Sequence, residues 1–234
     1  MKHIHILLIL FLVAFSVSAD EVAAYRLKVQ NFSELTVVDG VAVDYHCRQD
    51  SIGWAVFFTT PDKASQIMFE NNAEHLTIRS TADEAPILGL PTIKVYSASL
   101  KGVENSGDSL LRVFEPMHVD VLKIRQIGNG SIEIADIDAD YVDASVTAGK
   151  GQVMLSGKAN KAKFKNVSTG PIDASKLALK QANCFIFGIG NIDCLPSEQL
   201  RIYGAGTGKV YYHTTPGKIT NRGIGIKVHP ATEK

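Results

Sequence analysis

The 234-residue sequence has little of what marks nucleic-acid-binding, disulfide-stapled or metal-binding proteins. Lys plus Arg and Asp plus Glu each number 24, so the neutral chain has no electrostatic footprint for nucleic acid or for an anionic membrane. Three cysteines are too few for a disulfide-dense domain, and they form no Cys-x-x-Cys pair and no zinc-like spacing. We therefore expect no cofactor and no nucleic-acid partner.

Long apolar runs are absent after the first twenty residues. The chain starts with a weakly basic segment, continues with an uninterrupted apolar run over 6–15, and then has small or apolar residues in Val17-Ser18-Ala19. This order predicts a signal peptide over 1–19, export to the periplasm or cell surface, and a mature chain from Asp20. The alternative is an uncleaved anchor, but the run is about half of the roughly 20 residues that span a bilayer. We expect no membrane span after signal cleavage.

Glycine is plentiful and regularly placed. A phrase of a small residue, any residue, Gly, any residue and a branched aliphatic occurs five times, and Gly223-Ile224-Gly225-Ile226 is a weaker sixth copy. Successive copies start 21, 19, 20, 18 and 17 residues apart. A period near 20 residues is typical of stacked repeats. The five copies are Gly128-Asn129-Gly130-Ser131-Ile132, Gly149-Lys150-Gly151-Gln152-Val153, Ser168-Thr169-Gly170-Pro171-Ile172, Gly188-Ile189-Gly190-Asn191-Ile192 and Gly206-Thr207-Gly208-Lys209-Val210.

The flanks of the copies form apolar columns. Two-residue steps keep side chains on one face of a strand, so these columns are expected to point inward and to stack between coils. The second copy is displaced upstream by one residue, because Val142, Ala144 and Val146 carry its alternation. An antiparallel barrel or sandwich would also give short strands and glycine turns. The near-constant period favours an all-β, parallel β-helix-like solenoid with coils of about 20 residues over 119–234.

The part over 20–118 is β-rich and is expected to cap or extend the solenoid, so that 20–234 forms one continuous domain. Asp39-Gly40 is a tight-turn signal between two β-branched runs and predicts a hairpin. We expect strands at 35–38, 41–45, 54–58, 76–79 and 92–96, a helix at 62–71 and a loop at 86–91.

Taken together, the Gly-x-Gly-x-Ile/Val turns, the signal peptide and the segment Phe32-Ser33-Glu34-Leu35-Thr36-Val37 resemble a bacterial family. It is the putative autotransporter adhesin, head GIN domain family, and the resemblance covers roughly 30–228. The resemblance implies a β-solenoid that is exported to the periplasm or the cell surface and has an adhesin-type role. It supplies no catalytic residues.

Four aspartates form the most suggestive polar cluster: Asp136, Asp138, Asp140 and Asp143. Carboxylates at alternate positions share one strand face and can bind a hard cation such as calcium. The alternative is a solvated outer face, which is the ordinary environment of aspartate.

Two cysteines and two tyrosines fall in or beside the inward columns. Cys184 and Cys194 either bridge two walls of a coil or remain unpaired core residues, and a bridge requires Cα atoms within about 7 Å. Tyr212 occupies the inward column and is assigned to the core. Tyr211 is expected to point outward, which makes it the candidate for ligand contact.

The sequence contains no Gly-x-Ser-x-Gly elbow, phosphate loop or nucleotide fingerprint. We therefore predict a non-enzymatic binding or adhesion-type protein of the bacterial envelope whose partner is a protein or a glycan. The alternative is a polysaccharide-acting enzyme on a β-helix scaffold, which would need paired carboxylates or a base beside a cationic group. No Lys or Arg is interleaved with the aspartates. A solenoid end needs a cap, and at 219–228 a second copy of the chain can supply it in a homo-oligomer.

Overall fold

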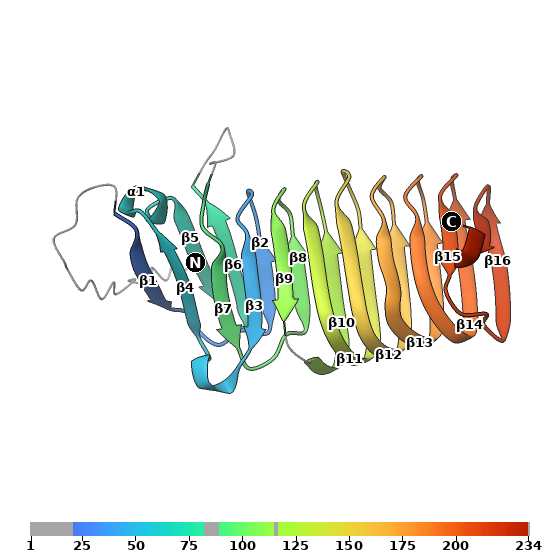
Figure 1. Ribbon diagram of the computed structural model, residues 1–234, viewed down its shortest axis with the longest axis horizontal. Helices are drawn as coiled ribbons and strands as arrows, with labels where there is room; N and C mark the ends of the chain where they lie inside the picture. Colours follow the sequence, from blue (N-terminus) through green and yellow to red (C-terminus); the bar gives the residue numbers. More distant parts are fainter. Residues whose placement is uncertain (1–20, 82–88, 115–116, 234) are drawn as a thin grey trace, which may run out of the picture.

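The computed structural model describes residues 21–81, 89–114 and 117–233. The expected signal peptide and part of the expected loop at 86–91 lie outside these residues. In Figure 1 the strands lie side by side along one long axis, with the N-terminal strands at one end and the C-terminal strands at the other. The protein is a β-solenoid extended by N-terminal strands, as the glycine period predicts.

Within the described residues there are three short helices and seventeen strands, of which β10 to β14 are the longest. The helices are η1 Gln49–Ser51, α1 Pro61–Ala64 and η2 Ala231–Glu233. The strands are β1 Ala23–Lys28, β2 Glu34–Val37, β3 Val43–Cys47, β4 Trp54–Thr59, β5 Ile67–Asn72, β6 His75–Ser80, β7 Ile93–Ser97, β8 Gly102–Asn105, β9 Leu110–Phe114, β10 Met117–Gln126, β11 Ser131–Val146, β12 Gln152–Asn166, β13 Ile172–Ile186, β14 Ile192–Ala205, β15 Lys209–Tyr212, β16 Lys218–Ile224 and β17 Lys227–Pro230.

Each of the strands β11 to β14 supplies three walls of a coil. In β11 the buried positions change phase twice, dividing the strand into segments 131–134, 137–139 and 141–146. The first segments stack in parallel on one another and form a wall that we call face A. At its N-terminal end this wall begins with β1, β4, β7, β3 and β9, and at its C-terminal end it finishes with β15 and β17. The last segments continue β5, β6, β2 and β8, and they end in β16; this wall is face C. Face B lies between them, on the middle segments.

The apolar columns form the core. Ile132, Val153, Ile172, Ile192 and Val210 are all fully buried, and each pairs in register with the next. Burial of these side chains along the whole axis removes from water the apolar surface that no coil could bury alone.

The one-residue slip in the second copy has a simple cause. Val146 and Val153 are seven residues apart, whereas Asn166 and Ile172, their partners on the next coil, are six apart. The corner after Val146 therefore contains one additional residue. The strands on both sides remain in register, and Val142, Ala144 and Val146 are fully buried, as the displaced alternation predicts.

The corners bring backbones of successive coils very close together. The Gly151 N–H donates to the Gly128 carbonyl over 3.0 Å, and a Cβ on Gly151 would lie 2.7 Å from the carbonyl oxygens of Gly128 and Gly130. Real Cβ atoms essentially never come that close to another heavy atom. Glycine is therefore required here by the approach of the neighbouring coil.

Buried asparagines hold some corners from inside. The Asn166 side-chain amide donates to the carbonyls of Gly170 (2.8 Å) and Asn191 (3.2 Å), and its oxygen accepts from the Ser168 N–H (3.0 Å). Asn105 makes the same kind of contacts three coils earlier. Because Asn191 belongs to the next coil, one side chain satisfies its own corner and ties it to its neighbour.

The N-terminal strands extend the stack, but the expected hairpin at Asp39-Gly40 is wrong. β2 pairs in parallel with β6 and β8 on face C, and β3 pairs in parallel with β7 and β9 on face A. Asp39 and Gly40, both with positive φ, form a corner between two walls. A tight-turn signal predicts where the chain changes direction, but it does not specify which strands then pair.

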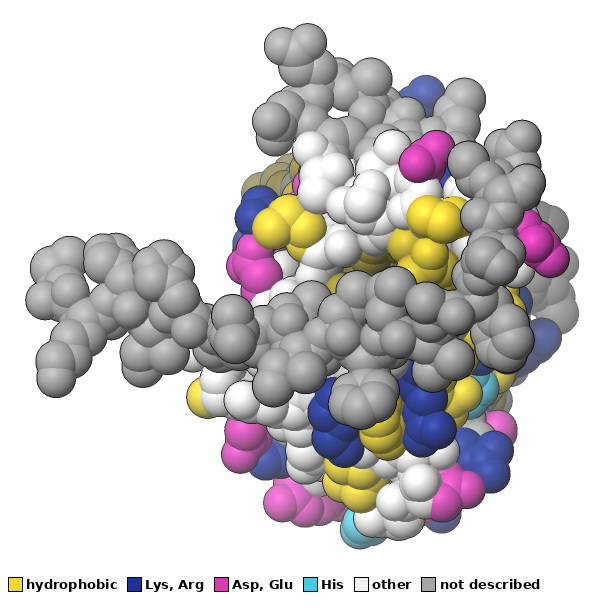
Figure 2. Space-filling view, turned by 90° about the vertical axis from the view of Figure 1, so that its left-hand side faces the viewer, with side chains coloured by type: hydrophobic (Ala, Val, Ile, Leu, Met, Phe, Trp, Pro, Cys, Tyr) yellow, Lys and Arg dark blue, Asp and Glu magenta, His cyan; other side chains and the backbone are white. Residues whose placement is uncertain are grey.

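The helix expected at 62–71 is also wrong for most of its length. α1 ends at Ala64, and residues from Ile67 belong to β5, which pairs antiparallel with β6. The side chain of Ile67 is buried while that of Met68 is exposed. Pairing as a strand therefore places Ile67 in the core, which a helix on the surface would do less completely. Figure 2 views this end of the solenoid, where hydrophobic side chains lie beside Lys and Arg.

Cys184 and Cys194 are both fully buried in inward columns, and their thiols are free. A hydrogen bond with Cys194 and burial raise the pKa of the Cys184 thiol well above its usual value. The two side chains therefore fill core space as unbridged cysteines.

The C-terminal coil has an open outer side. In the described part of the chain, β16 pairs with β14 and β17 pairs with β15, and neither has a partner beyond. Ile219 is 41% exposed and Ile224 is 77% exposed. Covering of this end by a second copy of the chain stays a prediction.

A β-bulge at Asp136 gives a test of the coil geometry. Ala135 and Asp136 together oppose Ser156, and Asp136 has φ of 55°. A β-branched side chain is strained at positive φ, so Asp136→Val should lower the free energy of unfolding by about 1–2 kcal/mol relative to Asp136→Gly. Urea denaturation of the two variants measures this difference. Equal midpoints would mean that the bulge does not hold this conformation in solution.

Candidate functional site

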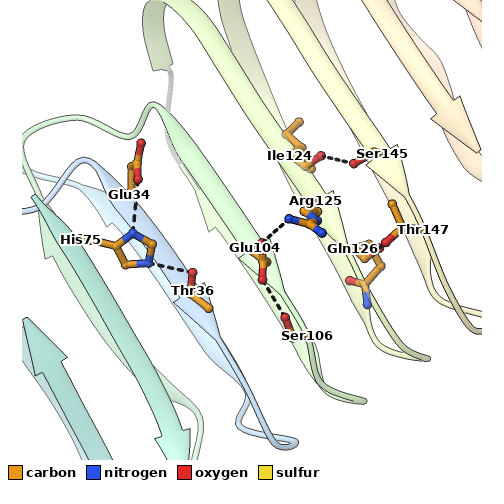
Figure 3. A network of polar contacts seen from close by, with 10 residues as sticks. All are labelled: Glu34, Thr36, His75, Glu104, Ser106, Ile124, Arg125, Gln126, Ser145 and Thr147. Carbon is orange, nitrogen blue, oxygen red and sulfur yellow. Dashed lines mark hydrogen bonds and ion pairs between the residues drawn. The ribbon is translucent and has the colours of Figure 1, made fainter. Parts of the chain in front are cut away.

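A shallow groove crosses face C in the N-terminal half of the solenoid (Figure 3). Its volume is about 340 Å³, and strands β2, β6, β8, β10 and β11 contribute its lining. The lining side chains carry both hydrogen-bond donors and acceptors. They are Glu34, Thr36, His75, Glu104, Lys123, Arg125, Asp143 and Ser145, around Gly102 and the backbone beneath.

Gly102 opens the groove because it has no side chain. It lies in register between Glu34 on β2 and Lys123 on β10. A Cβ at Gly102 would have the Glu34 Cγ as its nearest neighbour, at 3.5 Å, which is an ordinary contact. The fold therefore does not require glycine at this position, in contrast to the corner glycines. Because Gly102 has no side chain, a gap remains between the acidic Glu34 and the basic Lys123.

Three side chains at one end of the groove form a hydrogen-bonded chain. His75 Nε2 lies 2.8 Å from the Thr36 hydroxyl, and His75 Nδ1 lies 3.3 Å from a Glu34 carboxylate oxygen. The three residues come from neighbouring strands, because β6 pairs in register with β2. The imidazole and the Glu34 carboxylate are both substantially exposed, so they can contact a ligand.

The order hydroxyl, imidazole, carboxylate is also that of a nucleophilic triad. Acyl transfer additionally needs N–H donors aimed at the developing oxyanion. Thr36 lies in the middle of a strand that is paired on both sides, so the surrounding backbone N–H groups belong to the sheet ladders. Its register neighbour on β8 is Glu104, whose negative charge would oppose an oxyanion. The arrangement suits hydrogen bonding to a ligand better than nucleophilic attack.

Acid–base pairs continue the groove toward the next coils. Arg125 lies 3.5 Å from Glu104, which also accepts a hydrogen bond from Ser106. Lys163 lies 3.1 Å from Asp143. Exposed pairs of this kind are individually weak, and their groups remain available to exchange partners. The groove thus presents acceptors and donors alternately, which matches hydroxyl groups that can play both roles.

Three of the four aspartates of the sequence hypothesis contact polar side chains of the next coil, and two of these partners are lysines. Lys158 lies 3.1 Å from Asp138, Lys163 lies 3.1 Å from Asp143, and Asn160 donates to Asp140 over 2.7 Å. Each partner is 20 residues further along the chain. Asp136 stands apart, on the bulge. In the described part of the chain, no three His, Cys, Asp or Glu residues gather closely enough to hold a metal ion.

The pKa of Tyr141 is influenced by the Asp143–Lys163 ion pair, which lies beside it. Burial raises the pKa of Tyr141, the Asp143 carboxylate raises it further, and Lys163 acts in the opposite direction. Burial is the main cause of this shift, and the two members of the ion pair modify it in opposite directions.

Tyr211 follows the expected direction but not the expected exposure. It is in register with the outward Asp193, yet it is only 6% exposed and has the His229 ring 6.1 Å away. A buried tyrosine offers little surface to a ligand. Beside it, His213 Nε2 lies 3.1 Å from the buried Asp193 carboxylate, a pair that the sequence analysis missed. The two residues are 20 positions apart, close to the repeat length, and this spacing could have identified the pair from the sequence.

The ion pairs of the aspartates give two tests, one of the interaction energy of a pair and one of the response to calcium. Asp143→Asn and Lys163→Gln should show a coupling energy of about 0.2–1 kcal/mol in a double-mutant cycle, because both side chains are roughly one-third exposed. Calcium should leave the melting temperature of the unmodified chain unchanged, since lysines already neutralise two of the aspartates. A rise in melting temperature with calcium, lost in Asp143→Asn, would contradict this account.

Solved structures of similar fold come from Bacteroides and Parabacteroides species. A putative adhesin from Bacteroides fragilis has a TM-score of 0.79 at 19% identity, covering 89% of this chain and 97% of its own. A putative adhesin from Parabacteroides distasonis has 0.71 at 18%, covering 90% and 98%. A putative lipid binding protein from the same species has 0.68 at 18%, covering 89% and 96%. These likenesses show the fold.

No curated protein matched the chain. Among the described residues, no helix is long and apolar enough to cross a membrane. The model of one family, described as putative auto-transporter adhesin, head GIN domain, matches residues 31–216. This stretch contains the groove, all five copies of the glycine phrase and most of the core. The chain belongs to the putative auto-transporter adhesin, head GIN domain family.

Proposed function

We propose that this protein is a non-enzymatic, adhesion-type binding protein of the bacterial envelope, and that the groove around Gly102 holds part of a glycan. The observation that carries the proposal is the composition of the groove, where donors and acceptors alternate over five strands around a gap left by glycine. Sugar hydroxyls donate and accept hydrogen bonds, so such a lining can bind them without chemistry. A rigid sheet also holds these side chains in place before binding, which lowers the entropic cost.

The location supports the same conclusion. A signal peptide over 1–19 would deliver the chain to the periplasm or the cell surface, where glycans are abundant. The description of the family to which the chain belongs names an adhesin. Its relatives of similar fold are named as adhesins in two of the three cases given above.

The second candidate is a polysaccharide-acting enzyme, and one observation keeps it open to test: Thr36, His75 and Glu34 form a hydrogen-bonded chain. Glycoside hydrolysis ordinarily uses two carboxyl groups on opposite sides of the scissile bond. Glu34 already contacts His75, and Glu104 is already paired with Arg125, so neither carboxyl group stands free to flank a scissile bond. Binding without turnover therefore has the better support.

Filling the groove is the direct test. Gly102→Thr should abolish retention of the bound glycan in a panel of bacterial and host glycans, and it should change the free energy of unfolding by no more than about 0.5 kcal/mol, because the site is outward and open. Asn183→Thr is the matched control, because Asn183 lies in the same outward row four coils further on.

The panel also separates binding from catalysis. Retention without product release supports a binding protein. Product release that disappears in His75→Gln would establish an enzyme instead. Retention that is unaffected by Gly102→Thr would place the binding site elsewhere on the molecule.

A further inference from the structure

Strand β4, near the N-terminal end of face A, is apolar on both sides. Ala55 and Phe57 point inward and are buried, as a strand of the core requires. Trp54, Val56 and Phe58 alternate with them and therefore point outward, and Phe58 is 63% exposed. Outward positions of a solvated sheet are normally polar. Three consecutive outward apolar side chains form an unusual stripe.

Cations line both sides of this stripe. β1 contributes Arg26 and Lys28, and β7 contributes Lys94, all of them exposed and outward. The Arg26 guanidinium carbon lies 3.9 Å from the centroid of the Trp54 ring, and the Lys28 ammonium lies 4.7 Å from it. The segments β1, β4 and β7 contain no Asp or Glu. We call these six side chains, three apolar and three cationic, the β4 patch.

The acid nearest to the patch in register is already engaged. Asp44 on β3 pairs in register with Lys94, but its carboxylate accepts two hydrogen bonds from Arg112, at 2.8 and 3.1 Å. The Asp44 side chain is only 10% exposed. On the described strands β1, β4, β7 and β3, therefore, no acid remains free in register to offset the positive charge of the β4 patch, although the chain as a whole is neutral.

The shape of the patch distinguishes between anionic partners. A sugar stacks on the open face of an aromatic ring, but one side of Trp54 is occupied by the two cations. The adjoining rings of Tyr96, His46 and Phe114 stack on one another, with centroids 5.0–5.3 Å apart, so that both faces of His46 and the facing sides of the other two rings are covered. What remains exposed is a protruding phenylalanine beside a valine and a tryptophan, ringed by Lys and Arg. Tryptophan, phenylalanine and basic side chains are the residues that proteins place at lipid headgroups.

We propose that the β4 patch docks the N-terminal end of the solenoid on an anionic lipid surface. Phe58, Val56 and Trp54 enter the boundary between headgroups and acyl chains, and Arg26, Lys28 and Lys94 contact the lipid phosphates. The groove on face C then remains open to solution, because it lies on another wall. The docking does not depend on the glycan proposal, and either can fail alone.

The experiment uses the only tryptophan in the chain as a reporter. The chain from Asp20 is mixed with vesicles of phosphatidylglycerol and phosphatidylethanolamine in equal parts, or with vesicles of phosphatidylcholine alone. Trp54 emission should shift to shorter wavelength with the anionic vesicles and stay unchanged with the neutral ones. Added salt should reverse the binding, because screening weakens the cationic contacts.

Cosedimentation with the anionic vesicles tests the residues. Lys28→Gln with Lys94→Gln should weaken binding by about fivefold per charge removed. Phe58→Ser should weaken it by about tenfold. The matched controls are Lys161→Gln with Lys165→Gln, which removes two exposed lysines of β12, and Ile189→Ser, which removes an apolar side chain of similar exposure (60%) at a corner. Both controls and Gly102→Thr should bind as the unmodified chain does.

Several results would overturn the proposal. One is an unchanged Trp54 emission with anionic vesicles, and another is equal loss of binding in the patch and control variants. Displacement from the vesicles by soluble polygalacturonate at low salt, together with no vesicle binding at physiological salt, would assign the patch to an acidic polysaccharide. A dimer that dissociates on Phe58→Ser, seen by analytical ultracentrifugation, would assign it to a second copy of the chain.

Discussion

The close approach of backbones at the corners is the constraint on which the rest of the structure depends. Coils can stack at the spacing of a parallel sheet only if the chain turns sharply without a side chain between successive corners. Glycine meets this requirement at Gly151, Gly190 and Gly208, where a Cβ would lie within 2.7 Å of a carbonyl oxygen of the preceding coil. Buried Asn105 and Asn166 then tie corner to corner.

Once the corners are fixed, the register decides which side chains meet. A residue faces the residue about 20 positions further on, and each wall carries long rows that run along the axis. One row joins the aspartates of β11 to the lysines of β12, and another joins Asp193 to Tyr211. Electrostatic pairing between coils is thus a direct consequence of the repeat, and the outer surface of the molecule is organised in lines parallel to its axis.

The inward columns and the parallel stacking could be predicted from the sequence, because the period of two within a strand and the period of about 20 between coils are both visible there. The pairing of Asp143 with Lys163 could have been found by comparing residues 20 apart. The groove could not, because the coils of the N-terminal part have no constant length: Glu34, Gly102 and Lys123 are neighbours at separations of 68 and 21 residues. The hairpin at Asp39-Gly40 and the helix at 62–71 failed because local turn and helix signals cannot tell which distant strand will bury an apolar side chain. Likewise, the neutral total charge gave no hint of the cationic β4 patch, since the compensating acids lie on other coils.

The central claim is that backbone contact at the corners, and not a general preference for glycine, builds the solenoid. Unfolding of Gly170→Ala and Gly102→Ala in urea compares a corner with an open wall position. At Gly170 an added Cβ would collide with the Gly151 carbonyl and lie 2.7 Å from the Lys150 oxygen, whereas at Gly102 the nearest atom is at 3.5 Å. The account predicts that Gly170→Ala loses at least about 1–3 kcal/mol, while Gly102→Ala is unchanged or gains up to about 1 kcal/mol. Equal midpoints for the two variants would contradict it.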